Sequence, residues 1–382
     1  MTGTTASKSP DIFAPTTESE RAAVAAALVN GPLTSLFGGY SIAEFEKAFG
    51  ERFGYPHAVA VNSGTSALHS ALQALGVGPG DEVIVTPFSF VASVSVVVQS
   101  GAVPVFADID PKTFTLRPDA VRACLTERTK AVLPVHINGF PADMDGLLEV
   151  AQECGVSVVE DCAAAHGAMI GDRYVGGIGD FGCFSFNVAK VMRTGEGGMV
   201  VTRDAERDKA LRAIRVNGMV PGSQQPNGIE CLGFNYTMAQ PLAAIGVEQV
   251  NGFDEVFRRR ARNEALLNDR LGALGITVPV ARSGSERSAY ASPYLLPASL
   301  AGEGKKSVIA ELKRRDIPVS SGCGTPLYEI GYLTRYAPGG GLPTVEDVCS
   351  RLLVLDPRPE LDAATLENWC NQIEEVLRDH NA

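Results

Sequence analysis

The chain has 382 residues, 45% of them hydrophobic and 20% charged, which fits one large and one smaller globular domain and excludes a disordered polypeptide. Its net charge of −11 argues against nucleic acid as a partner, because phosphate binding needs a positive face. The N-terminus does not resemble a signal peptide, and the apolar run near 91–98 is too short to span a bilayer. We therefore expect a cytoplasmic protein that binds neither nucleic acid nor membrane.

Hydrophobic periodicity predicts a chain of alternating helices and strands. Residues 1–18 are polar and rich in proline and threonine, which predicts a flexible N-terminal arm. Strands are expected at 58–61, 82–85, 103–106, 130–135, 156–160, 181–186 and 198–202, and helices at 19–28, 42–53, 66–75, 91–99 and 144–154. Such alternation predicts an α/β fold with a mostly parallel sheet covered on both faces.

The pattern changes after residue 240. Further elements are expected at 240–250, through an arginine-rich stretch to 274, and at 276–278, 292–297, 307–315 and 362–378. They predict a large domain over 19–250 and a smaller C-terminal α+β domain over 251–382. The basic cluster of the stretch is expected to form a solvated face or a strip of inter-subunit salt bridges; it consists of Arg258, Arg259, Arg260 and Arg262.

The eight cysteines and five histidines show no metal-type spacing. No CxxC pair occurs, so we expect reduced thiols, several of them buried, and no metal site.

A lysine and an aspartate carry the strongest chemical signal. Lys190 precedes a glycine-rich turn, and Asp161 ends an apolar strand 29 residues earlier. A lysine amine forms a Schiff base with the aldehyde of pyridoxal phosphate (PLP), and a carboxylate pairs with its pyridinium nitrogen. Ligands of open α/β sheets bind beyond the carboxyl ends of the strands, which is where Asp161 is expected. His166, five residues later, is expected to have a structural or supporting role.

Other residues suit the remaining parts of such a cofactor. The turn Ser63-Gly64-Thr65 follows a strand and opens a helix, so its N–H groups and hydroxyls would suit a phosphate. The same residues would equally suit an ordinary helix cap. Ser185 could add a hydroxyl to the same phosphate, and Phe90 could stack on the cofactor ring, although an aromatic residue there also suits the core.

Taken together, these residues resemble the DegT/DnrJ/EryC1/StrS family of PLP-dependent aminotransferases, the sugar and cyclitol aminotransferases. The resemblance extends from about Glu18 to the C-terminal helix, and it is densest in 58–85, 136–143, 159–201 and 233–244. It implies PLP-dependent fold type I, which is aspartate-aminotransferase-like. It also implies a homodimer with active sites at the subunit interface.

The resemblance further implies roles for individual residues. Lys190 would bind PLP covalently and shuttle the proton between substrate and cofactor carbons, and Asp161 would hold the pyridine nitrogen. Phe90 would stack on the ring. The phosphate would be held by Ser63, Gly64, Thr65 and Ser185, and by Asn235 of the partner subunit acting in trans. An amino donor, glutamate or glutamine, would supply the amino group for a keto sugar or keto cyclitol in secondary metabolism.

The chain departs from the family pattern at two positions near the expected site. Ala164 stands where glutamine or histidine is common, and Thr237 stands where arginine is common. Losing the arginine removes a bidentate partner for a donor carboxylate. We therefore expect an unusual donor or acceptor.

Three other functions compete with this interpretation. A PLP-dependent dehydratase or an aminohydroxybenzoate synthase of the same family is one alternative; the branch of sugar dehydratases that replaces the lysine with histidine is disfavoured by Lys190. A non-catalytic PLP-binding partner protein is a second. A nicotinamide oxidoreductase is disfavoured, because the GxGxxG fingerprint is missing.

Overall fold

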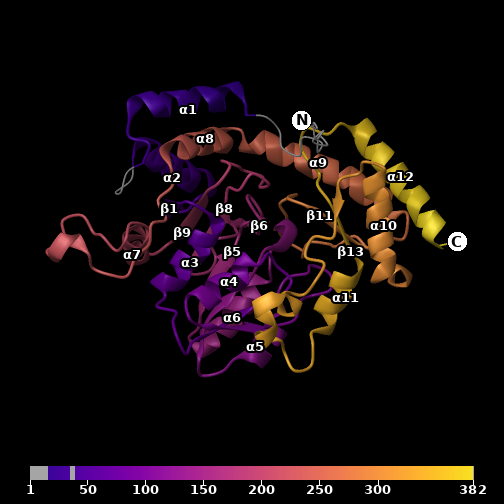
Figure 1. Cartoon of the computed structure of the whole chain (residues 1–382), viewed down its shortest axis with the longest axis horizontal. Coiled ribbons are helices and arrows are strands. Elements are labelled where there is room, and N and C mark those ends of the chain that lie inside the picture. Colours follow the sequence, from indigo (N-terminus) through magenta and orange to yellow (C-terminus); the bar gives the residue numbers. More distant parts are fainter. Residues whose placement is uncertain (1–15, 35–38, 382) are drawn as a thin grey trace, which may run out of the picture.

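The computed structural model of the chain describes residues 16–34 and 39–381. Its main sheet has seven strands in the order β1-β9-β8-β5-β4-β2-β3 (Figure 1). The strands are β1 (His57–Val61), β2 (Glu82–Val85), β3 (Val103–Phe106), β4 (Thr129–Leu133), β5 (Ser157–Asp161), β8 (Phe181–Ser185) and β9 (Gly198–Thr202). All seven had been predicted to within two residues.

Strand direction in this sheet brings the chemistry-bearing loops together. The pairs β2-β3, β2-β4, β4-β5 and β5-β8 are parallel, whereas β9 runs antiparallel to both β8 and β1. Every strand except β9 therefore points the same way, and their carboxyl ends meet at one edge. The predicted mostly parallel α/β sheet is confirmed.

Helices cover both faces of the main sheet, because alternate strand residues point to opposite sides. One face packs against α3 (Gly64–Ala74) and α4 (Ala92–Gln99). The other packs against α2 (Tyr40–Phe53) and α8 (Gln240–Asn251) at one end, and against α5 (Pro118–Cys124) and α6 (Met144–Cys154) at the other. Neighbouring buried residues of a central strand pack into opposite layers, as Val159 and Val158 of β5 do, which is the pattern of a doubly covered sheet.

The C-terminal part contains a second, antiparallel sheet. Its order is β11-β13-β12, formed by Ser292–Leu295, Leu352–Leu355 and Val319–Ser320. Its core packs against α9 (Phe253–Gly272), α10 (Glu303–Arg314) and α12 (Ala363–Asn381). These helices lie together at the right of Figure 1, beside α11 (Pro343–Arg351). The predicted strand 276–278 is wrong, because only Thr277 forms a single bridge, to Leu295.

The remaining elements lie at the periphery. Helix α1 (Glu18–Asn30) begins after a capping box formed by Thr17 and Glu20, so the C-terminal end of the predicted arm belongs to a helix; residues 1–15 of that arm lie outside the described residues. After α7 (Ala205–Arg215) a long loop extends away from the body (Figure 1). A small third sheet pairs β6 (Met169–Ile170) with β7 (Arg173–Tyr174) and β10 (Ser285–Glu286). Within the described ranges, no helix is long and apolar enough to cross a membrane.

Candidate active site

A cavity of about 580 Å³ opens at the carboxyl edge of the main sheet. Loops after β2, β4, β5 and β8 form one wall. The other wall is formed by Pro318 and by residues 320–325 and 354–356, which lie at or just after the ends of strands of the second sheet. Asp161, Lys190 and Phe90 all line it. Three residues of the predicted site, contributed by separate loops, therefore meet in one space.

Asp161 is held at the end of β5 with its carboxylate fixed. The Ser93 hydroxyl on α4 donates to Oδ2 at 2.7 Å, and the Ala163 N–H donates to Oδ1 at 3.1 Å. The residue is only 5% exposed yet lines the cavity. Each oxygen keeps a lone pair for a further donor.

Lys190 lies in the turn between β8 and β9. Its backbone N–H donates to the Asn187 carbonyl at 2.9 Å, which fixes the base of the side chain. The Lys190 Nζ lies 4.6 Å from the centroid of the Tyr290 ring, a cation–π distance. In the described part of the chain no carboxylate lies within ion-pair range of this amine, so the amine faces the cavity without a counter-ion.

The predicted phosphate-binding turn and Ser185 are neighbours. A side chain added at Gly64 would have its Cβ 2.6 Å from the Ser185 Cβ, so only glycine permits this approach. Ser63 caps α3 by accepting from the Ser66 N–H at 3.0 Å. These residues and Thr65 do not line the 580 Å³ cavity, so the turn lies beside it rather than on its wall.

Asn235 lies against the same turn of its own chain. Its carbonyl accepts from the Asn62 side-chain amide at 3.3 Å, and the Tyr236 carbonyl accepts from the Asn62 N–H at 2.8 Å. The residue is exposed. Of the two departures from the family pattern, Ala164 lines the cavity, while the Thr237 hydroxyl is buried without a hydrogen-bond partner among the described residues.

His166 is buried without hydrogen bonds. Neither ring nitrogen has a partner among the described residues, so the imidazole does not hydrogen-bond Asp161. The ring packs between Phe184 and Phe186, with centroids 5.5 Å and 5.6 Å away. Burial lowers the pKa of His166 to about 3, and the positive charge of Lys190 acts in the same direction. The imidazole is therefore neutral and structural.

The neutral state of His166 predicts a pH dependence of stability. Its folded pKa of about 3 lies below the ordinary 6.5, so between these values the unfolded chain binds one more proton. Stability should fall as the pH drops through this window, by about 1.4 kcal/mol per pH unit from this residue. We expect His166→Leu to reduce the slope of unfolding free energy between pH 4 and 6 by that amount, measured by urea denaturation. An unchanged slope would contradict a neutral His166.

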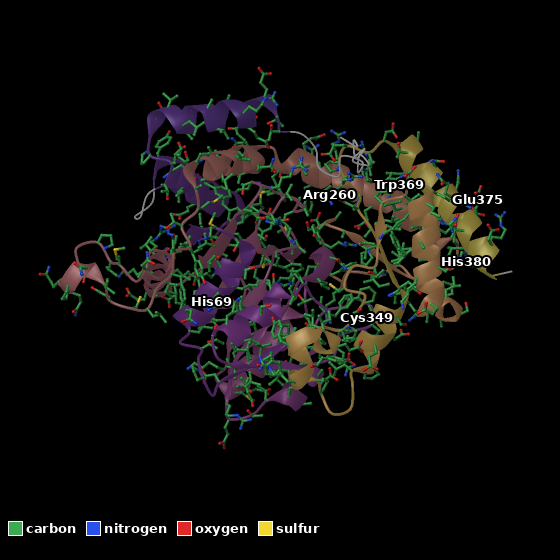
Figure 2. All side chains as sticks on the ribbon, in the orientation of Figure 1. His69, Arg260, Cys349, Trp369, Glu375 and His380 are labelled. Carbon is green, nitrogen blue, oxygen red and sulfur yellow. The ribbon has the colours of Figure 1, made fainter. Side chains whose placement is uncertain are left out.

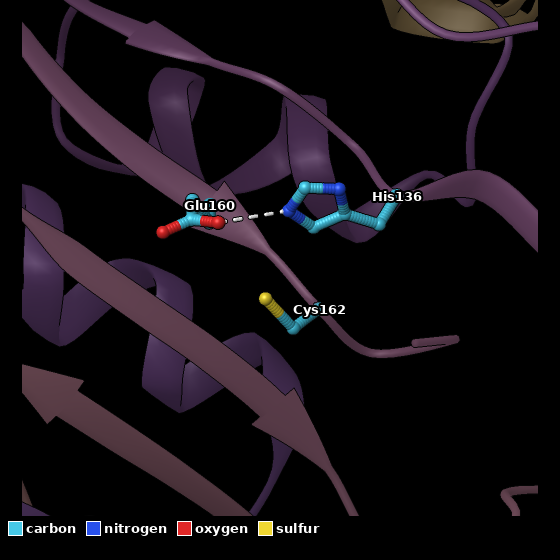
Figure 3. A group of neighbouring side chains, drawn as sticks. All are labelled: His136, Glu160 and Cys162. Atoms are coloured by element: carbon cyan, nitrogen blue, oxygen red, sulfur yellow. Dashed lines mark hydrogen bonds and ion pairs between the residues drawn. The ribbon is translucent and has the colours of Figure 1, made fainter. Parts of the chain in front are cut away.

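A buried trio of metal-ligating residue types lies behind Asp161. His136, Glu160 and Cys162 have ligand atoms within 4.8 Å of one another (Figure 3). The His136 Nδ1 accepts from the Ala142 N–H at 2.9 Å, so Nε2 carries the hydrogen and donates to Glu160 at 3.0 Å.

The trio is already satisfied by protein groups. Both Glu160 oxygens also accept backbone N–H groups, from Gly176, Ile178 and Gly179 at 2.6–2.9 Å. Burial raises the pKa of the Cys162 thiol well above its usual range. With both imidazole nitrogens and both carboxylate oxygens engaged, the trio is a hydrogen-bonded anchor for β5 and not a metal site.

One member of the arginine cluster is buried, contrary to the prediction of a solvated face. Arg260 on α9 is 6% exposed (Figure 2), whereas Arg258, Arg259 and Arg262 are exposed. Arg260 pairs with Asp356 at 2.6 Å and donates to the carbonyls of Ala289 and Tyr290. Since Tyr290 and Asp356 line the cavity, Arg260 holds the cavity wall in place.

Comparisons with known proteins agree with this geometry. A model of the DegT/DnrJ/EryC1/StrS aminotransferase family matches residues 15–374. The chain is 44% identical over 237 residues to a GDP-perosamine synthase of Caulobacter vibrioides, covering 62% of this chain and 63% of that protein. It is 40% identical over 304 residues to an L-glutamine:2-deoxy-scyllo-inosose aminotransferase of Streptomyces fradiae, covering 77% and 69%. A solved aminotransferase from Psychrobacter cryohalolentis has a TM-score of 0.90 at 31% identity, covering 97% and 100%.

Proposed function

The chain belongs to the DegT/DnrJ/EryC1/StrS aminotransferase family, and on that premise we propose that it is a PLP-dependent aminotransferase. It would transfer an amino group from glutamate or glutamine to a keto sugar or keto cyclitol. The observation that carries the proposal is that Lys190, without a counter-ion, and Asp161, with a fixed carboxylate, line one cavity.

The residues present fit the cofactor. Asp161 has a free lone pair on each oxygen for the pyridinium N–H. Gly64 leaves a space against Ser185 that any side chain would fill, beside the N-terminal end of α3. Phe90 is 72% exposed on the cavity wall, which leaves its ring face free for stacking. When bound, PLP supplies an electron sink that stabilises negative charge at the substrate carbon.

The side chains then have distinct tasks. The Lys190 amine would take the proton from the substrate carbon and deliver it to the cofactor carbon. The Tyr290 ring keeps the amine over the cavity. The carboxylate of Asp161 would keep the pyridine nitrogen of PLP protonated. The apolar parts of Phe90, Val135 and Ile137 limit access of water to the reacting atoms.

The relatives support the substrate class. One relative is named for the synthesis of GDP-perosamine, and the other for glutamine and 2-deoxy-scyllo-inosose. The aligned segments span only 63% and 69% of the length of those two proteins, so donor and acceptor belong to the proposal. The eight free thiols support a cytoplasmic location.

A homodimer is part of the proposal. Large apolar side chains are exposed at the start of α2, where Tyr40 is 76% exposed, and in the protruding loop after α7, where Leu232 is 74% exposed. Asn235 lies in the same region with an exposed side chain, so it could reach the site of a partner subunit.

We expect Asn235→Ala to weaken PLP binding about tenfold, because one donor to the phosphate is lost. Mixing this variant with a Lys190→Ala variant tests the action in trans. At a PLP concentration too low to load the Asn235→Ala homodimer, hybrid dimers contain one complete site and recover activity if Asn235 serves the partner's site. Recovery would fail if Asn235 acted within its own subunit. Different affinity tags on the two variants, captured one after the other, would verify that hybrids form.

An absorbance titration tests the proposed function. The PLP-loaded protein is mixed separately with glutamate, glutamine and alanine, and the cofactor spectrum is recorded. One donor should convert the spectrum to the aminated form, and a keto acceptor should restore it. Release of water from the acceptor without amino transfer would instead favour the dehydratase alternative. A spectrum unchanged by every donor would favour a non-catalytic PLP-binding protein.

A further inference from the structure

The wall of the cavity opposite the main sheet is a glycine-rich loop of unusual polarity. Residues 320–325 read Ser-Ser-Gly-Cys-Gly-Thr, and all six line the cavity that contains Lys190. In the described part of the chain, the N–H groups of Cys323, Gly324 and Thr325 have no acceptor, nor do the hydroxyls of Ser321 and Thr325. Free hydrogen-bond donors are thus concentrated on one side of the cavity.

A buried lysine lies directly behind this loop. Lys305 on α10 is 5% exposed, and its Nζ lies 3.2 Å from the position that a Cβ on Gly324 would occupy. The ammonium donates to one acceptor, the carbonyl of Cys349 at 2.5 Å. Cys349 lies on α11, at the lower right of Figure 2.

The charge of Lys305 is not balanced by the protein. Across residues 16–34 and 39–381, no carboxylate lies within 4.0 Å of its ammonium, whereas the neighbouring Lys306 pairs with Glu303 at 2.6 Å. Burial lowers the pKa of Lys305. Burial also raises the pKa of the adjacent Cys323 thiol to about 11, so the loop itself carries no negative charge. Buried charges are normally paired, and this one lacks a partner.

We propose that the loop 320–325, backed by Lys305, binds an oxyanion of the substrate. The free N–H groups and hydroxyls would donate hydrogen bonds to its oxygens, and the ammonium behind them would balance the charge. The inference rests on the proposed aminotransferase function and adds a specificity site to it. Two substrate groups have this chemistry: a carboxylate of the amino donor and a phosphate of a nucleotide-linked acceptor. The donor carboxylate would thereby have a partner despite the missing arginine at Thr237.

Binding of two anionic probes to the PLP-loaded protein tests the inference by calorimetry. Glutarate represents the donor carboxylate, pyrophosphate represents the acceptor phosphate, and PLP keeps its own phosphate site filled. We expect Lys305→Met to raise the Kd of one probe roughly tenfold, because a charge-assisted contact is lost. The matched control Lys306→Met, an exposed lysine one residue away, should leave both values unchanged. The probe that is weakened identifies the substrate group.

Two further measurements separate binding from a merely structural role of Lys305. The double variant Ser321→Ala, Thr325→Val alters only exposed side chains and should weaken the same probe even if Lys305→Met folds poorly. The Kd of neutral glutaramide should not change when the Lys305 ammonium is removed. The inference is overturned if wild-type protein binds neither anionic probe or if no variant weakens the binding of either one. It is also overturned if Lys305→Met weakens the binding of glutaramide as much as that of the anionic probe. An unresponsive donor titration would instead refute the aminotransferase function itself.

Discussion

Replacing Lys190 with alanine is expected to abolish transamination, with a loss on the order of 10⁴-fold, because the base that moves the substrate proton is gone. The absorbance band of covalently bound cofactor should disappear as well, while non-covalent binding persists through the phosphate-binding turn. The measurement is the rate of the donor half-reaction in single-turnover experiments, followed at the cofactor band.

A matched control and a rescue experiment make this result specific. Lys209→Ala removes an exposed lysine that pairs with Glu206 on α7, and it should leave the spectrum and the rate unchanged. Added methylamine should restore part of the activity of Lys190→Ala, since a small amine can enter the space left by the side chain. Substantial activity without added amine would show that another group moves the proton.

The sequence was sufficient to predict which loops carry the chemistry. Asp161 and Lys190 follow strands that were recognised from apolar runs, and the carboxyl ends of parallel strands must meet at one edge. Their meeting in one cavity therefore follows from topology. Phe90 could be predicted for the same reason, because it follows β2.

The opposite wall of the cavity could not be predicted in this way. Tyr290, Asp356 and the loop 320–325 come from the second sheet, whose packing on the first depends on contacts between distant segments. Arg260 illustrates the difficulty, since three exposed arginines surround it in sequence and only its register on α9 buries it.

The sequence also contains local signals for α7 and α11, two helices that the hydrophobic periodicity did not predict. Helix α7 begins after Asp204, whose side chain caps it. Its buried residues Leu211 and Ile214 are three positions apart, which is a helical spacing. α11 carries a proline at its first position, which also favours a helix start. By contrast, nothing in the sequence indicated that Glu160 would bind the backbone of residues 176–179, because that contact exists only in the folded chain.

Replacing Glu160 with glutamine is expected to lower the free energy of unfolding by about 3–5 kcal/mol, the cost of breaking a buried charged network. The two carboxylate oxygens accept four N–H groups, three from the backbone and one from His136. A glutamine side chain turns one oxygen into an NH₂ group, which would face two donors. His136 cannot relieve the conflict by changing tautomer, because its Nδ1 already accepts from Ala142.

The same change at an exposed position provides the control. Glu153→Gln also removes a carboxylate that pairs with an arginine, Arg122, but both side chains are about half exposed, so no measurable loss of stability is expected. Urea denaturation of the two variants compares them directly. Since Glu160 immediately precedes Asp161, the first variant should also weaken PLP binding. A Glu160→Gln variant as stable as wild type would mean that the anchor contributes little, and that Ser93 and Ala163 alone fix Asp161.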